Sequence, residues 1–420
     1  MVGVALVALA SGFGQFGIVA ALGDVARGFG HVVGGTSVAD QAGLSGTRLG
    51  LGLAVIRLAS LGALPVAGLA DRYGRRRTLL ATCAGGLALT VLAATSPGYW
   101  WFVVIFALGR PLLSATNALA GVSAAEQTGS GDRTRAMALV AAGYAAGAGL
   151  AAVLHGVIAA LGFRGLFALA ALPLAGLALL RSWVTEPDRF ALSAGAGDHA
   201  RPVVGAVAAP YRARLVVVGL LAFAVSVVTG PANSYVFLYG QDVLHRSGPV
   251  LAAMVVAAGV IGLPGLLLGR ALADRLGRRP TCAGAVLAMA GGGILMYSGS
   301  VAAFFAGYLL GVLAGSVFAP GAGALLNELF PTAVRASVSG WQVAAGVLGA
   351  ATGLVVFGAL ADAGRWGVAA GITFAPAAVS ALLYLLLPET RGREPEDLWP
   401  TPALSRAEPR PGDAVPGAGS

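Results

Sequence analysis

The chain has 420 residues, of which 57% are hydrophobic and only 11% are charged. A water-soluble domain of this size needs about a quarter of its residues charged to cover its surface, so the composition excludes soluble enzymes and nucleic-acid-binding proteins. The positive charge behind the net +9 comes entirely from arginine, because the sequence contains no lysine. Two cysteines, Cys83 and Cys282, are too few for a disulfide framework or a four-cysteine zinc site. We therefore expect a polytopic membrane protein with no metal and no other cofactor.

Apolar runs of membrane-spanning length recur along the whole chain. A transmembrane helix takes roughly 20 apolar residues, and twelve such runs are separated by charged or turn-rich residues. No basic residue precedes Arg27, so we expect the first run to be a retained transmembrane helix and not a cleaved signal peptide. The sequence thus predicts an all-α integral membrane protein. The twelve predicted helices are 2–26, 47–69, 78–95, 99–124, 136–160, 163–184, 215–238, 249–269, 281–299, 302–326, 336–361 and 366–387.

The distribution of arginines predicts the orientation of these helices. Cytoplasmic loops carry an excess of basic residues, and an even number of helices places both termini on the same side. That side holds 20 of the 27 arginines, and the opposite side holds five. We therefore expect a multi-pass protein of the plasma (inner) membrane with both termini in the cytoplasm.

The two halves of the chain repeat the same charged features. The motif Gly68-Leu-Ala-Asp71-Arg72-Tyr-Gly74-Arg75-Arg76 recurs, from its second residue, as Leu272-Ala-Asp274-Arg275-Leu-Gly277-Arg278-Arg279, at an offset of 203 residues. Glu186 closes the sixth predicted helix and Glu389 the twelfth, at the same offset. Matching offsets predict a duplicated unit. The predicted parts are a six-helix bundle at 1–184, a cytoplasmic linker at 185–212, a second six-helix bundle at 213–389 and a disordered cytoplasmic tail at 390–420.

These motifs resemble the signature sequences of the major facilitator superfamily. Residues 68–77 and their second copy are similar to the loop between its second and third helices, and residues 328–335 and 387–392 to sequences of its sugar-porter and metabolite-symporter branches. The resemblance covers residues 1–395. It implies a secondary transporter in which two pseudo-symmetric six-helix bundles rock about a central site.

The repeated loops form a candidate conformational latch. An aspartate beside a run of arginines can pair with those cations and with the positive N-terminal end of a neighbouring helix. The resemblance implies that both aspartates hold an outward-facing state closed on the cytoplasmic side, braced by Glu–Arg pairs seven residues apart; alternatively, the arginines only set the topology. The candidate latch residues are Gly68, Asp71, Arg72, Gly74, Arg75, Arg76, Asp274, Arg275, Gly277, Arg278 and Arg279, with the pairs Glu126–Arg133 and Glu328–Arg335.

Two arginines lie about halfway along predicted helices, Arg57 on the second and Arg110 on the fourth. Charge near the bilayer centre costs about 2.5–3.5 kcal/mol on insertion scales and indicates function. Because no carboxylate lies at comparable depth, the pair favours an anionic solute held by bidentate guanidinium contacts. The resemblance places the fourth helix on the cavity. The alternatives are pairing with backbone carbonyls for Arg57 and a packing or gating role for Arg110.

Uncharged polar residues on the helices that line the cavity could complete the site. Gln15, Asn117 and Asn233 are the candidate substrate contacts, although each could instead bond across helices. Proton coupling requires a buried group that titrates. The candidates are Asp24 on the first helix and His155 on the fifth, which could alternatively be a packed polar residue.

The sequence supports a transporter and no enzyme, because it contains no phosphate-binding loop, metal cluster or nucleophile triad. The preferred function is proton-coupled symport of a small organic anion or metabolite. Two alternatives are a proton-antiport exporter of a drug or secondary metabolite and a sensor that binds solute without moving it. The linker of 28 residues is short for a signalling region. The expected partners of this monomer are the solute, protons and the lipid bilayer, with no nucleic acid.

Overall fold

The computed structural model describes residues 1–420 except 129–131, 159, 161, 187–206, 208 and 394–420. Most of the predicted linker and of the predicted tail therefore lies outside the described residues. The part of the chain that is described is helical, with no strand. Ten of its segments are long and apolar enough to cross a membrane. The remaining two predicted crossings correspond to α7 and α16, each of 19 residues and each beginning at an arginine.

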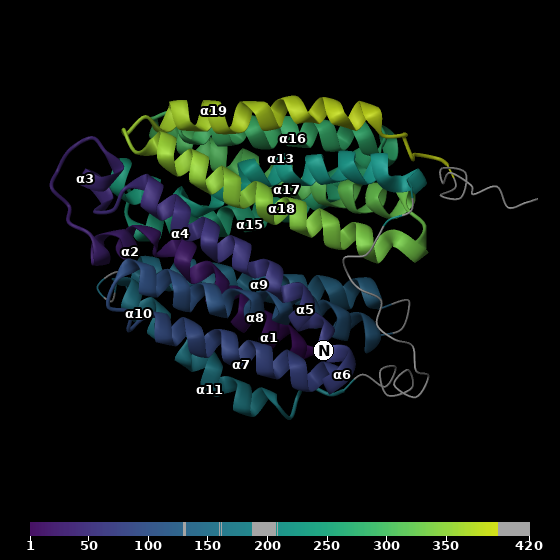
Figure 1. The fold of residues 1–420 in the computed structure, drawn as a ribbon, viewed down its shortest axis with the longest axis horizontal. Coiled ribbons are helices and arrows are strands. Elements are labelled where there is room, and N and C mark those ends of the chain that lie inside the picture. The colour runs from purple at the N-terminus through teal and green to yellow at the C-terminus, as the bar shows by residue number, and fades with distance from the viewer. Residues whose placement is uncertain (129–131, 159, 161, 187–206, 208, 394–420) are drawn as a thin grey trace, which may run out of the picture.

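The first half of the chain supplies six crossings (Figure 1). The second crossing is interrupted by a short 3₁₀ turn, and the first and sixth are each split in two. The elements are α1 (Val2–Ala20), α2 (Leu22–Phe29), α3 (Val38–Ala42), α4 (Gly46–Ala59), η1 (Ser60–Gly62), α5 (Ala63–Gly68), α6 (Ala70–Tyr73), α7 (Arg75–Ala93), α8 (Tyr99–Glu126), α9 (Arg133–Val157), α10 (Gly162–Ala168) and α11 (Ala171–Leu180).

The second half supplies six further crossings. Its first crossing continues beyond the predicted end through a turn of π-helix, η4. The elements are η3 (Ala209–Tyr211), α13 (Arg212–Ser234), α14 (Val236–Leu238), η4 (Tyr239–Val243), α15 (Gly248–Arg275), α16 (Arg278–Met296), α17 (Val301–Leu329), α18 (Thr332–Ala361), α19 (Trp366–Val379) and η5 (Ser380–Leu386).

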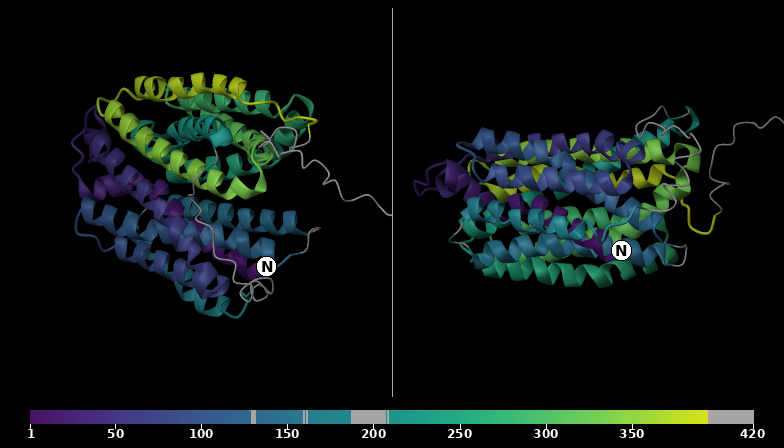
Figure 2. Two further views of the ribbon diagram at one scale, coloured as in Figure 1. Left: turned by 45° about the vertical axis from the view of Figure 1, so that its right-hand side comes forward. Right: turned by 90° about the horizontal axis from the view of Figure 1, so that it is seen from below.

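The two halves lie side by side with their helices roughly parallel to a common axis (Figures 1 and 2). Met1, the α6–α7 junction and the end of η5 lie at one end, which we call the terminus side. The connection between α2 and α4 lies at the other end, which we call the opposite side. The halves converge at the opposite side and separate toward the terminus side (Figure 2).

Two helix pairs join the halves, α4 with α18 and α9 with α15. They approach through small residues: a Cβ added at Gly50 would lie 2.4 Å from the carbonyl oxygen of Leu354, and one at Gly156 would lie 2.9 Å from the backbone of Gly248. Such contacts let helix backbones meet closely in a membrane. Both contacts lie toward the opposite side, where the two halves are therefore packed together.

Buried aromatic side chains form the core near the opposite side. In the first half the rings of Phe29, Phe102 and Phe163 lie 5.1–6.0 Å apart. In the second half Tyr239 and Trp366 are 5.1 Å apart. Tilted and edge-to-face pairs of this kind contribute beyond simple area burial. Clusters of aromatic rings thus pack each half near the opposite side.

Candidate functional site

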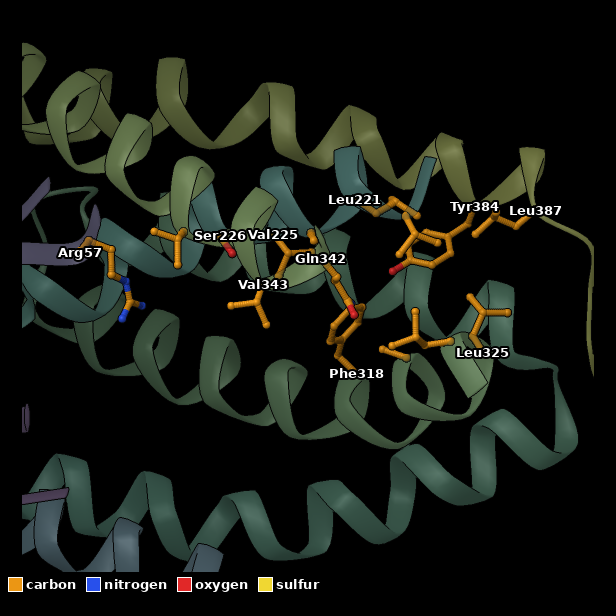
Figure 3. Close-up of a pocket in the computed structure, with 16 residues that line it drawn as sticks. Arg57, Leu221, Val225, Ser226, Phe318, Leu325, Gln342, Val343, Tyr384 and Leu387 are labelled. Atoms are coloured by element: carbon orange, nitrogen blue, oxygen red, sulfur yellow. The ribbon is translucent and has the colours of Figure 1, made fainter. Parts of the chain in front are cut away.

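A cavity of about 410 Å³ lies on the inner face of the second half, toward the terminus side. Its walls come from α13, α17, α18 and η5, and α4 of the first half contributes Arg57. Figure 3 shows the Arg57 guanidinium near Ser226 at one end of the cavity, with Leu325 and Tyr384 near the other. Most of the lining is apolar, so Arg57 is the charged group of this surface.

The structure brings Arg57 and Arg110 together. Both side chains are half-buried, and their charges repel each other; each also interacts electrostatically with Tyr144 on α9. The Nε atom of Arg110 is buried without a hydrogen-bond partner in the described structure. Neither guanidinium group forms an ion pair among the described residues. Two like charges without an acid between them create a positive site at the interface of the halves.

The three predicted amide contacts lie in different surroundings. Gln15 is 6% exposed, and its Nε2 donates to Ser11 Oγ at 2.9 Å and to the Leu113 carbonyl at 3.1 Å. One amide bond therefore stays within α1 and the other crosses to α8, which is the cross-helix bonding that the sequence left open. Asn117 is half-buried, seven residues after Arg110 on α8 and so on the same helix face. Asn233 is exposed and borders a second cavity.

The two candidate proton-coupling residues are in contact on the opposite side. His155 Nδ1 lies 3.4 Å from Asp24 Oδ2, and its Nε2 lies 3.3 Å from Gln241 Nε2. Arg27 bonds to Asp24 at 2.5 Å and also to Asp242, whose side chain is only 6% exposed. The first half provides Asp24, Arg27 and His155, and the second half provides the other two. This group, which we call the opposite-side network, therefore ties the halves together.

Sequence reasoning missed Arg27, Gln241 and Asp242. Arg27 follows Asp24 by three residues, the spacing of helical neighbours, and could have been noticed. Gln241 and Asp242 lie in the π-helical turn η4. Nothing in the apolar pattern signals that turn.

A second connection on the same side caps α4. The carboxylate of Asp362, at the end of α18, accepts hydrogen bonds from Gly46 N at 2.5 Å and from Thr47 N at 3.2 Å. The Thr47 hydroxyl also donates to it. An acid at a helix N-terminus satisfies free N–H groups and favours the helix dipole. Because cap and helix belong to different halves, this contact also holds the opposite side closed.

On the terminus side, each motif copy begins a helix that a distant glutamate caps. Glu186 accepts from the backbone N–H groups of Arg75 and Arg76 at 2.5 and 3.1 Å. Glu389 does the same for Arg278 and Arg279, at 2.9 and 3.2 Å. The same pattern of donors and acceptor in both halves shows that these repeated positions are structurally equivalent.

The glycine of each motif copy is required by this cap. Gly74 has φ +95° and Gly277 has φ +113°, a conformation that residues with a Cβ rarely adopt. A Cβ at Gly277 would also lie 2.7 Å from a carboxylate oxygen of Glu389, and one at Gly74 would lie 3.2 Å from Glu186. The glycines therefore permit both the backbone turn and the approach of the carboxylate.

Two further glutamates, Glu126 at the end of α8 and Glu328 near the end of α17, pair with arginines of the repeated motif. Arg75 Nη2 lies 3.3 Å from Glu126, and Arg278 Nη2 lies 3.4 Å from Glu328. Arg335, the expected partner of Glu328, donates instead to the backbone carbonyls of Asn327 at 2.8 Å and Phe330 at 3.2 Å. The brace in the second copy therefore links the ends of α16 and α17.

Of the other predicted latch residues, some are exposed on the surface and some have side chains outside the described residues. Asp274 is 55% exposed and lies 3.5 Å from Arg278 Nη1. Arg72 and Arg275 are exposed. The side chains of Asp71 and Arg133, and thus the expected Glu126–Arg133 brace, lie outside the described residues.

The Glu389 cap on α16 should stabilise the fold down to mildly acidic pH. Burial alone would raise the pKa of Glu389, but hydrogen bonds from the backbone N–H groups of Arg278, Arg391, Arg279 and Thr390 outweigh burial and lower it. The pKa of Glu389 is therefore lower in the folded protein than in the unfolded chain. At a pH above the unfolded pKa the ionised carboxylate stabilises the fold, and this stabilisation is lost as the pH falls through the pKa of the folded protein.

We expect Glu389→Ala to lower the free energy of unfolding by about 1 kcal/mol at neutral pH. The difference from wild type should be constant near neutral pH and narrow from about pH 5 downward, because the unfolded glutamate, with an ordinary pKa of about 4.3, begins to take up protons there. Thermal unfolding of both proteins from neutral pH down to about pH 3 measures this difference. A difference between the two proteins that already narrows above about pH 6 would contradict the proposed capping role.

Comparison with known proteins identifies the family. The family model described as Major Facilitator Superfamily matches residues 4–300 and 257–411. The 3-(3-hydroxy-phenyl)propionate transporter of Escherichia coli (strain K12) is 30% identical over 347 residues, covering 79% of this chain and 82% of the relative. The chain therefore belongs to the major facilitator superfamily, and it is a transporter, not an enzyme.

Further comparisons agree with this fold and leave the branch open. The probable 4-methylmuconolactone transporter of Cupriavidus pinatubonensis is 27% identical and covers 87% of this chain and 88% of the relative. The class G tetracycline resistance protein of Vibrio anguillarum is 26% identical, at 76% and 80% coverage. The inward open xylose transporter XylE from E. coli superposes with a TM-score of 0.72 at 20% identity, covering 95% of this chain and 98% of that chain. The predicted architecture of twelve helices in two bundles is confirmed.

Proposed function

We propose that the protein carries a small organic anion, such as a carboxylate, across the plasma membrane together with protons. The observation that carries this proposal is that Arg57 lines the cavity and interacts with a second arginine, Arg110, while neither has an acidic partner among the described residues. An uncompensated charge in this environment is costly. A substrate carboxylate would supply the missing counter-charge, and the planar guanidinium group binds it in a bidentate manner.

The contacts between the halves support alternating access. The opposite side is closed by the Asp362 cap and the opposite-side network, whereas the cavity lies toward the terminus side. With both termini in the cytoplasm, as the arginine distribution predicts, this is an inward-facing state. The exposed Asp274 fits a latch that is released in this state and engages when the terminus side closes.

The opposite-side network supports proton coupling. Protonation of Asp24 or Asp242 would remove a negative charge from Arg27, and protonation of His155 would add a positive charge to the network. Either change alters the attraction that holds the two halves together. The protonation state would thus bias which side of the protein is open.

A second candidate function is export of an amphiphilic drug or secondary metabolite by proton antiport. The observation that favours it is the apolar wall of the cavity, which includes Leu221, Val225 and Phe318. The name of the tetracycline resistance relative agrees with this alternative, and the name of the propionate transporter agrees with the first. The two arginines distinguish them, because a lipophilic cation would be repelled.

Uptake into proteoliposomes under an imposed pH gradient tests the proposal. A pooled panel of organic acids, sugars and amphiphilic drugs is offered, and accumulation is measured by mass spectrometry. We expect one class of organic acid to accumulate, and to do so only when protons flow in the same direction. Movement of drugs alone, against the proton flux, would establish the exporter and exclude anion symport.

A further inference from the structure

A second cavity, of about 180 Å³, lies within the second half between α13, α16 and α17. It is separate from the first cavity, and its lining includes no charged residue. Three observations bear on what it holds: its position relative to the first cavity, its size, and the polar groups that border it.

The two cavities follow the same face of α17. Tyr308, Gly311 and Gly315 line the second cavity, and the stripe continues through Phe318 and Ala322 in the first. These positions are spaced by three or four residues, which places them on one face of a helix. The cavities therefore lie end to end along α17.

The face of α13 shows the same continuity and places the charge between the cavities. Ser226 lines the first cavity and Thr229, one turn further along the helix, lines the second. Arg57 lies at the same end of the first cavity as Ser226 (Figure 3), and Ser226 is the residue one turn from Thr229. A carboxylate bound by Arg57 would therefore lie next to the entrance of the second cavity.

The walls of the second cavity suit a ring. They are formed by glycine, alanine, valine and methionine, including Met289 and Met296, and thioether sulfur makes favourable contacts with aromatic rings. An apolar cavity of about 150 Å³ in another protein binds benzene, so the volume here is sufficient for one six-membered ring.

Two polar groups border this apolar space. Among the described residues the hydroxyl of Tyr308 has no hydrogen-bond partner. Asn233 uses its Nδ2 to donate to Thr229 O at 2.8 Å, which leaves its Oδ1 as an acceptor. A ring that carries one hydroxyl or carbonyl group could satisfy them.

We infer that the second cavity binds the ring of a carboxylate substrate. The carboxylate lies at Arg57 and Arg110, a short chain crosses from one cavity to the other, and Asn233 and Tyr308 bind a hydroxyl or carbonyl group on the ring. This inference rests on the proposed function and specifies its substrate class as ring-bearing carboxylates.

A cavity-filling variant tests the inference. A Cβ added at Gly311 meets no atom within 4 Å, so Gly311→Val places methyl groups in the cavity without a clash at the Cβ. Gly291→Val is the matched control, because Gly291 is exposed on α16 and its added Cβ also meets open space. Binding to the purified full-length protein is measured calorimetrically with three probes: 3-(3-hydroxyphenyl)propionate, the uncharged 3-phenylpropan-1-ol and the ringless pentanoate.

We expect Gly311→Val to weaken both ring-bearing probes by about tenfold or more, a change of about 1.4 kcal/mol, while pentanoate binds as in Gly291→Val. Arg110→Ala should weaken the two carboxylates and spare 3-phenylpropan-1-ol. Tyr308→Phe should weaken 3-(3-hydroxyphenyl)propionate by about threefold to tenfold, because one net hydrogen bond is lost, and leave 3-phenylpropan-1-ol, whose ring carries no hydroxyl, unchanged.

The two hypotheses fail in different ways. Equal binding of the ring-bearing probes to Gly311→Val and Gly291→Val, including binding to neither, would overturn the ring site. Carboxylate binding that persists in Arg110→Ala would overturn the anion site and leave the ring site supported if Gly311→Val still weakens 3-phenylpropan-1-ol.

Discussion

Arg110→Ala is expected to reduce uptake of the transported anion by about 100-fold, while the protein still inserts in the membrane. Removing one partner of a buried charge pair typically costs 2–5 kcal/mol, and Arg110 has no other counter-charge among the described residues. The same substitution removes a desolvated charge from the empty protein. We therefore expect its melting temperature to stay unchanged or to rise.

This combination separates a binding role from a packing role. A structural arginine would lower the melting temperature when removed, whereas a substrate-binding one would lower uptake alone. Arg48→Ala is the control, because Arg48 is an exposed arginine at the start of α4, on the same helix as Arg57. Initial uptake rates in proteoliposomes and thermal unfolding of the three proteins provide the measurement. Normal uptake by Arg110→Ala would refute the assignment.

Arg27→Ala is expected to open the opposite side. Arg27 pairs with Asp24 of its own half and with Asp242 of the other half, and Asp242 is almost fully buried. Without the arginine, the two carboxylates lose their shared cation and the attraction between the halves. Because the Arg27 side chain is 37% exposed, its removal costs less than the roughly 3–5 kcal/mol of a fully buried pair. A loss of about 1.4 kcal/mol is enough to shift the balance between inward- and outward-facing states by tenfold.

Cysteine labelling measures this shift. Cys83 and Cys282 are free and buried, so both are replaced by serine, and a single cysteine is introduced at Leu354, which is 2% exposed at the α4–α18 contact. A water-soluble maleimide should label this cysteine about tenfold faster in Arg27→Ala. Arg246→Ala is the control, since Arg246 is exposed after η4 and its Nε donates only to the nearby Leu244 carbonyl. Equal labelling in both variants would contradict a gating role for the network.

The helices could be predicted well from the sequence, and their interruptions could not. Length and hydropathy place all twelve crossings, because the bilayer imposes both. The pattern predicted one continuous second helix at 47–69, where the structure has α4, η1 and α5 in succession. It also ended the seventh helix at 238, before η4. Local changes of helix type depend on packing, which hydropathy does not report.

The candidate site could be predicted only in part, because packing also determines which of its residues meet. Arg57 and Arg110 stand out as charges within apolar runs, and the packing of α4 against α8 brings them together. The contact between Asp24 and His155 depends on how the first and fifth crossings are rotated, which the sequence does not reveal. The arginine partner of Glu328 was misjudged because Arg335 is nearer in sequence, whereas Arg278 is nearer in space.

The glutamate caps bear on how the protein is made. Each cap joins residues about 110 positions apart within one half, Glu186 to the start of α7 and Glu389 to the start of α16. No residue of the other half takes part in these hydrogen bonds. Residue 186 is synthesised before any residue of the second half, so the first half can complete its own closure before the second half is finished. The two bundles can thus mature in succession, each secured by its last helix before the pair assembles.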